Sequence, residues 1–423
     1  MSVIISHPSV APFVQQAARA IHEQGQLDRL LTTVRDDPGS PAQRLLCWAG
    51  RLAGRDLAAR FRQRAVTEVP PELVESHPWG ELLRLAAGSV DRDGRLTDYV
   101  WQRTENAFDG LAARRLHRGL TGVYGFEHSS LRTFERARDI GIRIAYDTPA
   151  PEPRLVRRVL DAELERFPEL RTGYHRYTAR LEEERTAHRH AEWHCADVVI
   201  AASSYTRRSF ADSGFDVSKV QVIPYGAPPV AARDKALGGG SAPGAPLALL
   251  WAGTFSVRKG AHHLLEAWRA GGFGRSARLR VFGTVALPER VLRPVPDGVE
   301  LNGPVPRPEL MARYLECDAL LFPTLCDGFG MVVTEAWSSG LPVVTTTSAG
   351  AADLLRPGEN GTLVRPGDPG AIAEAIEWCL SHRPQLRSMR ESALSTAENW
   401  QWADYRRTLG GALRRAQLFG PSP

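Results

Sequence analysis

Residues 319–336 read ALLFPTLCDGFGMVVTEA. An apolar run of strand length, Ala319–Phe322, leads into a loop that contains Gly328 and Gly330, and a helical pattern follows. Glycines allow a backbone to approach a ligand closely. The free N–H groups and the dipole at the start of a helix favour a phosphate. The segment therefore predicts a strand–loop–helix unit that binds an anion, although a strand–loop–helix without a ligand has the same pattern.

A second segment, residues 250–260, reads LWAGTFSVRKG and has a similar layout. It begins inside an apolar run, and Arg258 and Lys259 come just before the next helical pattern. Two cations at the start of a helix are unfavourable unless an anion lies there. The pair therefore favours a diphosphate ligand, with a solvated basic pair as the alternative.

Outward from these segments, short apolar strands alternate with helical patterns along the chain, which is typical of parallel sheets buried on both faces. Predicted strands of the first half lie at 3–6, 30–33, 122–125, 143–146, 198–201 and 220–223. Those of the second half lie at 247–251, 279–282, 299–301, 319–322, 342–345 and 361–364. The sequence predicts an α/β protein with two Rossmann-like, doubly wound domains that face a cleft, where ligands bind beyond the carboxyl ends of the strands.

The segment 227–246, APPVAARDKALGGGSAPGAP, is rich in Pro, Gly and Ala and lacks periodicity, so we predict a hinge there. The predicted division is an N-terminal domain over 1–226, a C-terminal domain over 247–400, and a final helix over 401–423 that packs back on the N-terminal domain.

Composition narrows the class. The chain has 423 residues, 43% hydrophobic residues and a formal net charge of +5, which suits a globular protein with anionic ligands. Its five cysteines form no CxxC, which argues against a disulfide scaffold or a zinc ribbon and fits a reducing cytoplasm. The sequence shows no secretory signal pattern, no membrane-spanning run, and no nucleic-acid-binding signature.

The motifs resemble those of family 4 glycosyltransferases. The segment from Asp327 to Gly330, with Glu335 and then 340–344, is similar to the E-x7-E signature of that family. The resemblance continues in 195–197, 219–226 and 360–364, in the same order along the chain. It implies the GT-B fold, in which one Rossmann-like domain binds a nucleotide-sugar donor and the other, here the N-terminal one, binds the acceptor.

The resemblance also implies roles for individual residues. Glu335 corresponds to the glutamate that holds the donor ribose, and Lys259, with Arg258, would neutralise the diphosphate. Asp327 replaces the first glutamate of the signature and is one methylene shorter, and Thr254 stands where the family often has arginine. The remaining residues of the implied donor site are Gly253, Gly328, Phe329, Gly330, Met331 and Val332.

The implied activity is that of a retaining hexosyltransferase or other glycosyltransferase that needs neither a cofactor nor a metal, with a UDP-sugar as the expected donor. The acceptor is a small molecule, a saccharide or a lipid-linked molecule. Two alternatives stay open: a nucleotide-sugar hydrolase or epimerase on the same fold, and a catalytically silent sugar-nucleotide-binding protein, which the Asp327 replacement allows.

The acceptor side is harder to read from the sequence. Glu127 and His128 follow the predicted strand 122–125, where the family often places a functional polar residue, so both are candidate catalytic residues. A loop histidine without a role is an equal alternative. His7 follows the first strand and is a candidate for lining the cleft.

Two further patterns have competing interpretations. The segment 43–65 is a basic amphipathic helical pattern that either packs on its own domain or rests on an anionic membrane at the inner face. His190 and His194 have the i, i+4 spacing of a zinc pair, but they belong to His-Ala-Glu-Trp-His without an obvious third ligand, and we expect no metal there.

Overall fold

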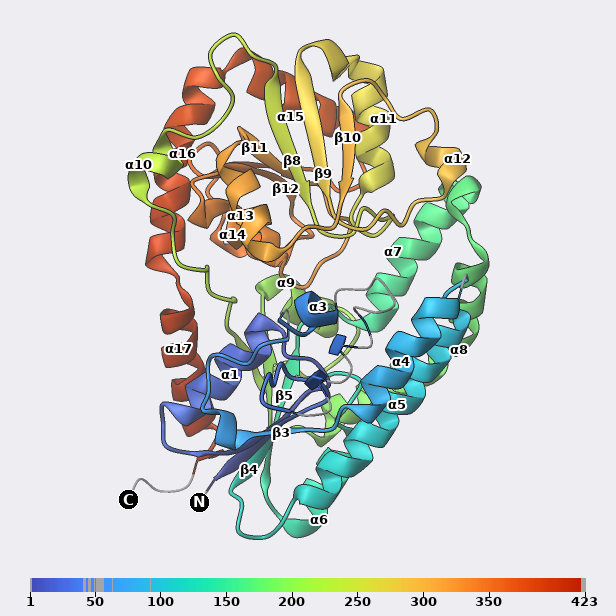
Figure 1. Ribbon diagram of the computed structural model, residues 1–423, viewed down its shortest axis with the longest axis vertical. Helices are drawn as coiled ribbons and strands as arrows, with labels where there is room; N and C mark the ends of the chain where they lie inside the picture. Colours follow the sequence, from blue (N-terminus) through green and yellow to red (C-terminus); the bar gives the residue numbers. More distant parts are fainter. Residues whose placement is uncertain are drawn as a thin grey trace.

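Two parallel β-sheets, each flanked by helices, build the two halves of the molecule (Figure 1). A computed structural model describes residues 2–40, 43–44, 47–48, 50, 57–62, 64–91 and 93–419. Within this part of the chain, the first sheet consists of β1 (Val3–Ser6), β2 (Leu27–Thr32), β3 (Val74–Ser76), β4 (Gly122–Phe126), β5 (Arg143–Thr148), β6 (Val198–Ala201) and β7 (Val220–Val222). The second sheet consists of β8 (Leu247–Ala252), β9 (Ala277–Phe282), β10 (Val299–Gly303), β11 (Ala319–Phe322), β12 (Val343–Thr346) and β13 (Gly361–Val364).

The strand order identifies both sheets as doubly wound. The orders are β3-β2-β1-β4-β5-β6-β7 and β10-β9-β8-β11-β12-β13, and every pairing is parallel. The direction of winding reverses between β1 and β4 in the first sheet and between β8 and β11 in the second. The predicted fold class is therefore confirmed, and these two reversal points are where ligands bind in such sheets.

Helices cover the sheets because their apolar faces, like the strands, need burial. Those of the first half are α1 (Pro12–His22), α3 (Leu57–Arg62), α4 (Trp79–Val90), α5 (Arg95–Arg115), α6 (Leu131–Ile140), α7 (Pro153–Arg166), α8 (Gly173–Cys195) and α9 (Ser204–Ala211). Those that follow are α10 (Arg233–Leu237), α11 (Ala261–Gly271), α12 (Glu289–Leu292), α13 (Arg307–Leu315), α14 (Met331–Ser338), α15 (Pro369–Ser381), α16 (Arg383–Asn399) and α17 (Trp402–Arg415). Central strands such as β8 and β11 are buried along their whole length, as their continuous apolar sequence requires.

The structure differs from the sequence-based expectation in the first half. Two long helices, α7 and α8, follow β5, and they are separated because Pro168 disfavours a helical conformation at Phe167. The strand β3 and the helices α4 and α5 were not predicted. The apolar residues of α4 and α5 are partly exposed, so their sequences lack a clear apolar stripe.

The connection between the two sheets pairs with the segment just before α17, and α17 itself packs on the first half. The segment 227–246 contains the short helix α10, and Ala227 forms a parallel bridge with Gln401. Helix α17 follows this bridge and lies beside α1 of the first half (Figure 1), where Arg406 forms an ion pair of 2.9 Å with Glu23.

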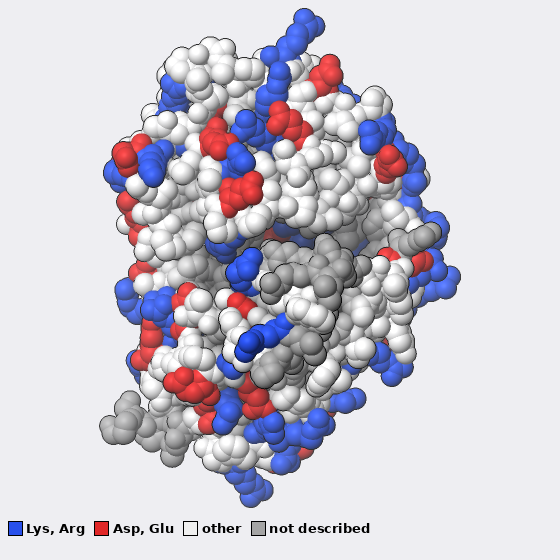
Figure 2. All heavy atoms as spheres, in the orientation of Figure 1, with Lys and Arg blue, Asp and Glu red and all other residues white. Residues whose placement is uncertain are grey.

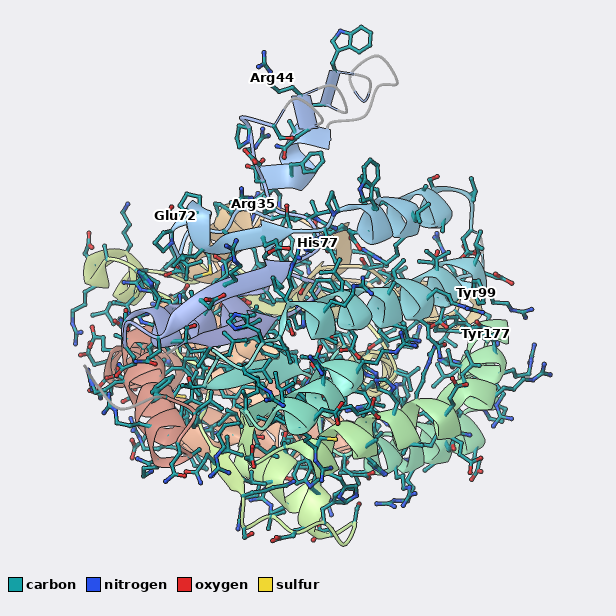
Figure 3. The ribbon with its side chains drawn as sticks, turned by 90° about the horizontal axis from the view of Figure 1, so that it is seen from below. Arg35, Arg44, Glu72, His77, Tyr99 and Tyr177 are labelled. Carbon is teal, nitrogen blue, oxygen red and sulfur yellow. The ribbon has the colours of Figure 1, made fainter. Side chains whose placement is uncertain are left out.

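Much of the segment 43–65 lies outside the described residues, namely 45, 46, 49, 51–56 and 63. Its described part includes α3 and the exposed residues Arg44 and Trp48. Figure 3 shows Arg44 on a segment that projects from the body of the molecule. None of the helices that the structure describes has the length and apolarity to cross a membrane.

Candidate functional site

The two predicted ligand-binding segments meet at the reversal point of the second sheet. Strands β8 and β11 are neighbours and parallel, so the loops that leave their carboxyl ends emerge side by side. The amide of Leu325 donates a hydrogen bond of 3.0 Å to the carbonyl of Arg258. Gly260 has a positive φ of 76°, and a Cβ there would lie 2.1 Å from the carbonyl oxygen of Pro323. Only glycine therefore allows this close approach of the two loops.

At the centre of this junction, Lys259 forms a close ion pair with Asp327. Arg258 lies 3.5 Å from the same carboxylate oxygen and also donates a 2.6 Å hydrogen bond to the carbonyl of Cys326. Burial alone would raise the pKa of Asp327, but the charges of Lys259 and Arg258 outweigh it and hold this pKa below its ordinary value. Burial lowers the pKa of Lys259, which Asp327 partly offsets. The site thus holds two cations against one carboxylate, an excess of positive charge that suits an anionic ligand.

Glu335 lies one turn into α14, on the same loop–helix unit as Asp327. Its side chain is 10% exposed, and this burial raises its pKa. It pairs with two residues of α13. Arg307 forms an ion pair of 2.9 Å with one carboxylate oxygen, and the hydroxyl of Tyr314 donates to the other over 3.3 Å. Sequence reasoning did not find these partners, because nothing in the pattern of α13 relates it to α14.

The other residues of the predicted donor site surround the same loops. Gly253 and Thr254 are exposed beyond β8. Gly330 precedes α14 with a φ of 85° and offers no side-chain cap, so the amides of Met331 and Val332 have no acceptor within the helix, whereas Val333 donates to the carbonyl of Gly330 over 2.9 Å. Phe329 is different: its ring packs against Tyr225 of the first half, and its amide donates to Asp327 over 3.1 Å. The remaining members of the predicted set, Gly328 and Val332, lie on either side of these positions.

The Asp327 loop also contacts the first half of the chain. Gly328 lies against the segment after β5, where a Cβ would be 1.9 Å from the carbonyl oxygen of Pro149. The hydroxyl of Ser203 donates a 2.6 Å hydrogen bond to the carbonyl of Gly328. Figure 2 shows a hollow across the middle of the molecule, between the two halves, with basic side chains at its edge. Contacts from both halves therefore position the Asp327 loop.

Glu127 and His128, the predicted acceptor-side residues, follow β4 beside the reversal point of the first sheet. Glu127 forms an ion pair of 2.5 Å with Arg189 of α8, and Arg189 also donates to the carbonyl of Pro151 over 3.4 Å. His128 has a positive φ of 75°, and burial and the charge of Arg189 lower its pKa well below the ordinary value. The imidazole of His128 is therefore neutral and only weakly basic.

A cavity of about 700 Å³ opens beside His128 between α4, α5 and α8. The ring of Trp101 lies edge-on to His128 at 5.5 Å, and Arg185 pairs with Asp98 at 2.5 Å on the same wall. Figure 3 shows Tyr99 and Tyr177 together at one end of this helical layer. The cavity offers an aromatic face and fixed charges, a mixture suited to a polar organic ligand.

Asp147, at the end of β5, is a buried carboxyl that sequence reasoning missed. The hydroxyls of Tyr124 and Tyr225 donate to it over 2.6 and 3.3 Å. Burial raises its pKa to about 7. Its sequence context, an acidic residue ending an apolar strand, was the available signal.

Asp147→Asn is expected to change how stability depends on pH. The unfolded chain releases the proton near the ordinary value of 3.8, whereas the folded protein keeps it to about 7. Between these values the folded state binds more protons, so the free energy of unfolding falls as pH rises, by at most about 1.4 kcal/mol per pH unit. Urea unfolding at pH 5 and 7.5 should show a smaller decrease for the variant than for the wild type. Equal decreases would contradict the buried, protonated state of Asp147.

The remaining histidine candidates are held by other contacts. His7 packs edge-on against Phe126 with ring centroids 4.8 Å apart, at the first reversal point. His190 bonds to Glu152 at 2.9 Å, whereas His194 stacks on Phe215 at 5.6 Å. In the part of the chain that the structure describes, the side chains that converge as metal ligands would are instead Glu163, His262 and His263.

Comparison with known proteins identifies the second half. Residues 246–382 match the family described as glycosyl transferases group 1. Over 108 residues the chain is 32% identical to D-inositol 3-phosphate glycosyltransferase 1 of Catenulispora acidiphila, a match that covers 26% of each protein. The chain thus spans about a quarter of the length of the curated relatives it matches. The resemblance to family 4 glycosyltransferases is confirmed by these matches, and the family match over 246–382 includes Lys259, Asp327 and Glu335.

Similarity to solved structures extends over both halves. Sucrose-phosphate synthase of Thermosynechococcus elongatus aligns with a TM-score of 0.65 at 16% identity, over 98% of each chain. The Anabaena protein HepE in complex with UDP-glucose aligns with a TM-score of 0.56 at 16% identity, over 98% of this chain and 100% of its own. At these identities the similarity establishes the fold, which is the predicted GT-B fold.

Proposed function

We propose that this protein is a glycosyltransferase that moves a sugar from a nucleotide diphosphate to an acceptor hydroxyl. The observation that carries the proposal is the junction of the two loops after β8 and β11, where Lys259 and Arg258 converge on Asp327, eight residues before Glu335 in α14. The family match of residues 246–382 supports the same assignment, because it covers this junction.

The proposed donor is a UDP-sugar. Lys259 and Arg258, with the amides at the start of α14, would hold the diphosphate, and Glu335 would accept hydrogen bonds from the ribose hydroxyls. The HepE structure with UDP-glucose supports this choice of nucleotide. Thermal stabilisation by UDP-, GDP- and dTDP-sugars tests it: only the true donor class should raise the melting temperature in the micromolar range.

The proposed mechanism is electrostatic and needs no metal at the diphosphate. As the glycosidic bond breaks, negative charge grows on the leaving diphosphate, and the two cations stabilise that charge more than the charge of the intact donor. The first half would place the acceptor hydroxyl beside His128, with the cavity of about 700 Å³ holding the rest of the acceptor.

The decisive experiment separates transfer from the two alternatives. Incubation of the protein with the UDP-sugar alone and with a panel of saccharide and lipid-linked acceptors should give a glycosylated product only in the second case. Release of free sugar at the same rate in both cases would favour the hydrolase, and a bound but unconverted donor would favour the silent binding protein.

The product is expected to keep the anomeric configuration of the donor. The two carboxylates at the junction are engaged by cations, and Glu127 is paired with Arg189. Burial and the charge of Arg189 lower the pKa of His128 well below its ordinary value, so its imidazole is a weak base. The proton NMR coupling of the new glycosidic linkage measures the outcome. A β-linkage from an α-linked donor would contradict retention and would make Glu127 or His128 the catalytic base.

A further inference from the structure

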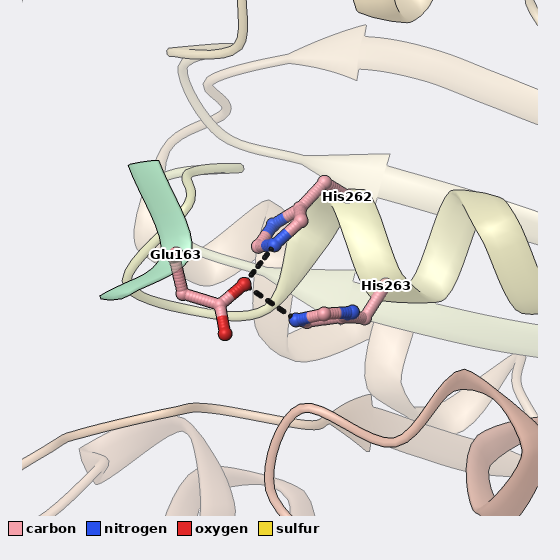
Figure 4. A group of neighbouring side chains, drawn as sticks. All are labelled: Glu163, His262 and His263. Carbon is pink, nitrogen blue, oxygen red and sulfur yellow. Dashed lines mark hydrogen bonds and ion pairs between the residues drawn. The ribbon is translucent and has the colours of Figure 1, made fainter. Parts of the chain in front are cut away.

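Glu163, His262 and His263 form a cluster that joins the two halves of the molecule (Figure 4). Glu163 lies on α7 of the first half, and the two histidines begin α11 of the second half. Both imidazole Nε2 atoms lie 2.7 Å from the same carboxylate oxygen, Oε2 of Glu163. The histidine side chains are 4% and 0% exposed, and that of Glu163 is 13% exposed.

The contacts and burial of this cluster shift the pKa values of Glu163 and His262. Burial would raise the pKa of Glu163, but the hydrogen bonds from His262 and His263 outweigh it and lower this pKa to about 2. Burial also lowers the pKa of His262. The hydrogen bonds from the two imidazoles thus stabilise the ionised carboxylate of Glu163.

We propose that Glu163, His262 and His263 form a binding site for a divalent transition metal ion of the zinc class. Two imidazole nitrogens and one carboxylate oxygen are a ligand set that suits zinc. The three ligand atoms already lie within 4.8 Å of one another. Ligand atoms around one tetrahedral zinc ion are about 3.4 Å apart, because each lies 2.0–2.2 Å from the metal. Loading therefore requires each imidazole Nε2 to move away from Oε2 of Glu163 by about 0.7 Å, from 2.7 Å to about 3.4 Å.

The site has an entry path and room for a fourth ligand. Glu163 lines an open pocket of about 460 Å³ together with Leu325 and Gly367. At Gly367 a Cβ would come within 3.6 Å of both the Glu163 carboxylate and Nε2 of His263, so the glycine keeps this side of the cluster uncrowded. A solvent molecule on the pocket side completes the coordination of a metal held by three protein ligands.

A metal at this site would fix the donor junction to the first half. His262 is three residues after Lys259, and the turn between them includes Gly260, which packs on Pro323 of the second loop. Coordination by Glu163 of α7 would restrain α11, and with it the loop that carries Lys259. The proposed role is thus to hold the two halves together, separate from the chemistry at the diphosphate.

The test measures zinc binding by untagged, metal-stripped protein, with melting temperature and competition against a zinc-sensitive dye as readouts. Wild type should bind about one zinc ion, and at a hundredfold excess over Kd its melting temperature should rise by on the order of 5 °C. Glu163→Gln is the key variant, because an amide oxygen can still accept from both histidines but is a poor zinc ligand. It should keep the metal-free melting temperature and lose most of the zinc-induced rise.

Glu165→Gln is the matched control, since it removes the same charge from an exposed position of the same helix. It should bind zinc like the wild type. His262→Gln gives a second test if Glu163→Gln fails to fold, and it too should weaken zinc binding at least tenfold. Mg²⁺, which prefers oxygen ligands, should have no effect. The proposal is overturned if the wild type does not bind zinc. It is also overturned if Glu163→Gln and His262→Gln both bind zinc with the affinity of the wild type. Both conclusions hold whatever the outcome of the transfer assay.

Discussion

Lys259→Ala is expected to lower kcat for sugar transfer by roughly 10²–10³-fold while weakening UDP binding much less. The Lys259 side chain is 18% exposed and lies where the loops after β8 and β11 meet, so water screens its charge only weakly. Its interaction with the diphosphate strengthens as the leaving group gains charge, and a contact of that kind contributes to rate more than to binding. Steady-state kinetics with the UDP-sugar and equilibrium binding of UDP give the two quantities.

Two further variants test whether the effect is specific to the charge of Lys259 at the junction. Lys235→Ala removes the same charge from an exposed position on α10 and should leave both quantities unchanged. Asp327→Asn removes the carboxylate that competes for Lys259 and Arg258, so UDP should bind at least as tightly as to wild type, while transfer slows. A Lys259→Ala rate within threefold of the wild type would place the diphosphate elsewhere. If the Asp327→Asn enzyme lost UDP affinity, Asp327 would be a direct donor ligand.

The metal independence of the chemistry needs a background in which the proposed zinc site is disabled. Transfer by Glu163→Gln should therefore continue in EDTA at the rate it has without EDTA. This comparison keeps the two proposals apart, because a loss of activity in EDTA would then concern the diphosphate site alone.

The strands and loops of the second half could be predicted from the sequence. Its strands are short, continuous apolar runs, and its loops after β8 and β11 contain glycines that no residue with a side chain could replace. Gly260 and Gly328 face carbonyl oxygens at distances that no Cβ could occupy. Each of these backbone constraints requires a glycine at one position, so the sequence itself shows where they lie. The strands β8, β11 and β13 begin where they were expected, and the family resemblance follows from the same residues.

What the sequence did not predict depends on contacts between distant segments. The Arg307–Glu335 pair joins α13 to α14, the Arg189–Glu127 pair joins α8 to β4, and Glu163 reaches histidines about a hundred residues away. No spacing rule connects such partners. The adjacent histidines at the start of α11 have no spacing that indicates a metal site, and their partner Glu163 is far away in the sequence.

Glu335→Ala is expected to lower UDP affinity by about 10² or more and to reduce transfer below detection. A hydrogen bond to a charged group contributes about 1.5–3 kcal/mol, and the ribose diol would make two to this carboxylate. Glu335 is largely buried, so a lost partner is not replaced by solvent as it would be at the surface. Arg307, which is 43% exposed, can stay hydrated after the substitution, so the fold is expected to survive.

If Glu335 binds the ribose, the substitution should weaken the binding only of nucleotides that carry the ribose hydroxyls. Wild type should bind UDP much more tightly than 2′,3′-dideoxy-UDP, and Glu335→Ala should bind the two equally, at the affinity that wild type shows for the dideoxy analogue. Arg307→Ala is the comparison variant. It leaves the carboxylate in place but removes the charge that opposes the burial-raised pKa of Glu335, so UDP binding should persist at pH 8 and fall off at a higher pH than in wild type as the pH is lowered. If Glu335→Ala still discriminates between UDP and its dideoxy analogue, the carboxylate does not bind the ribose, and its contacts with Arg307 and Tyr314 serve only to hold α13 against α14.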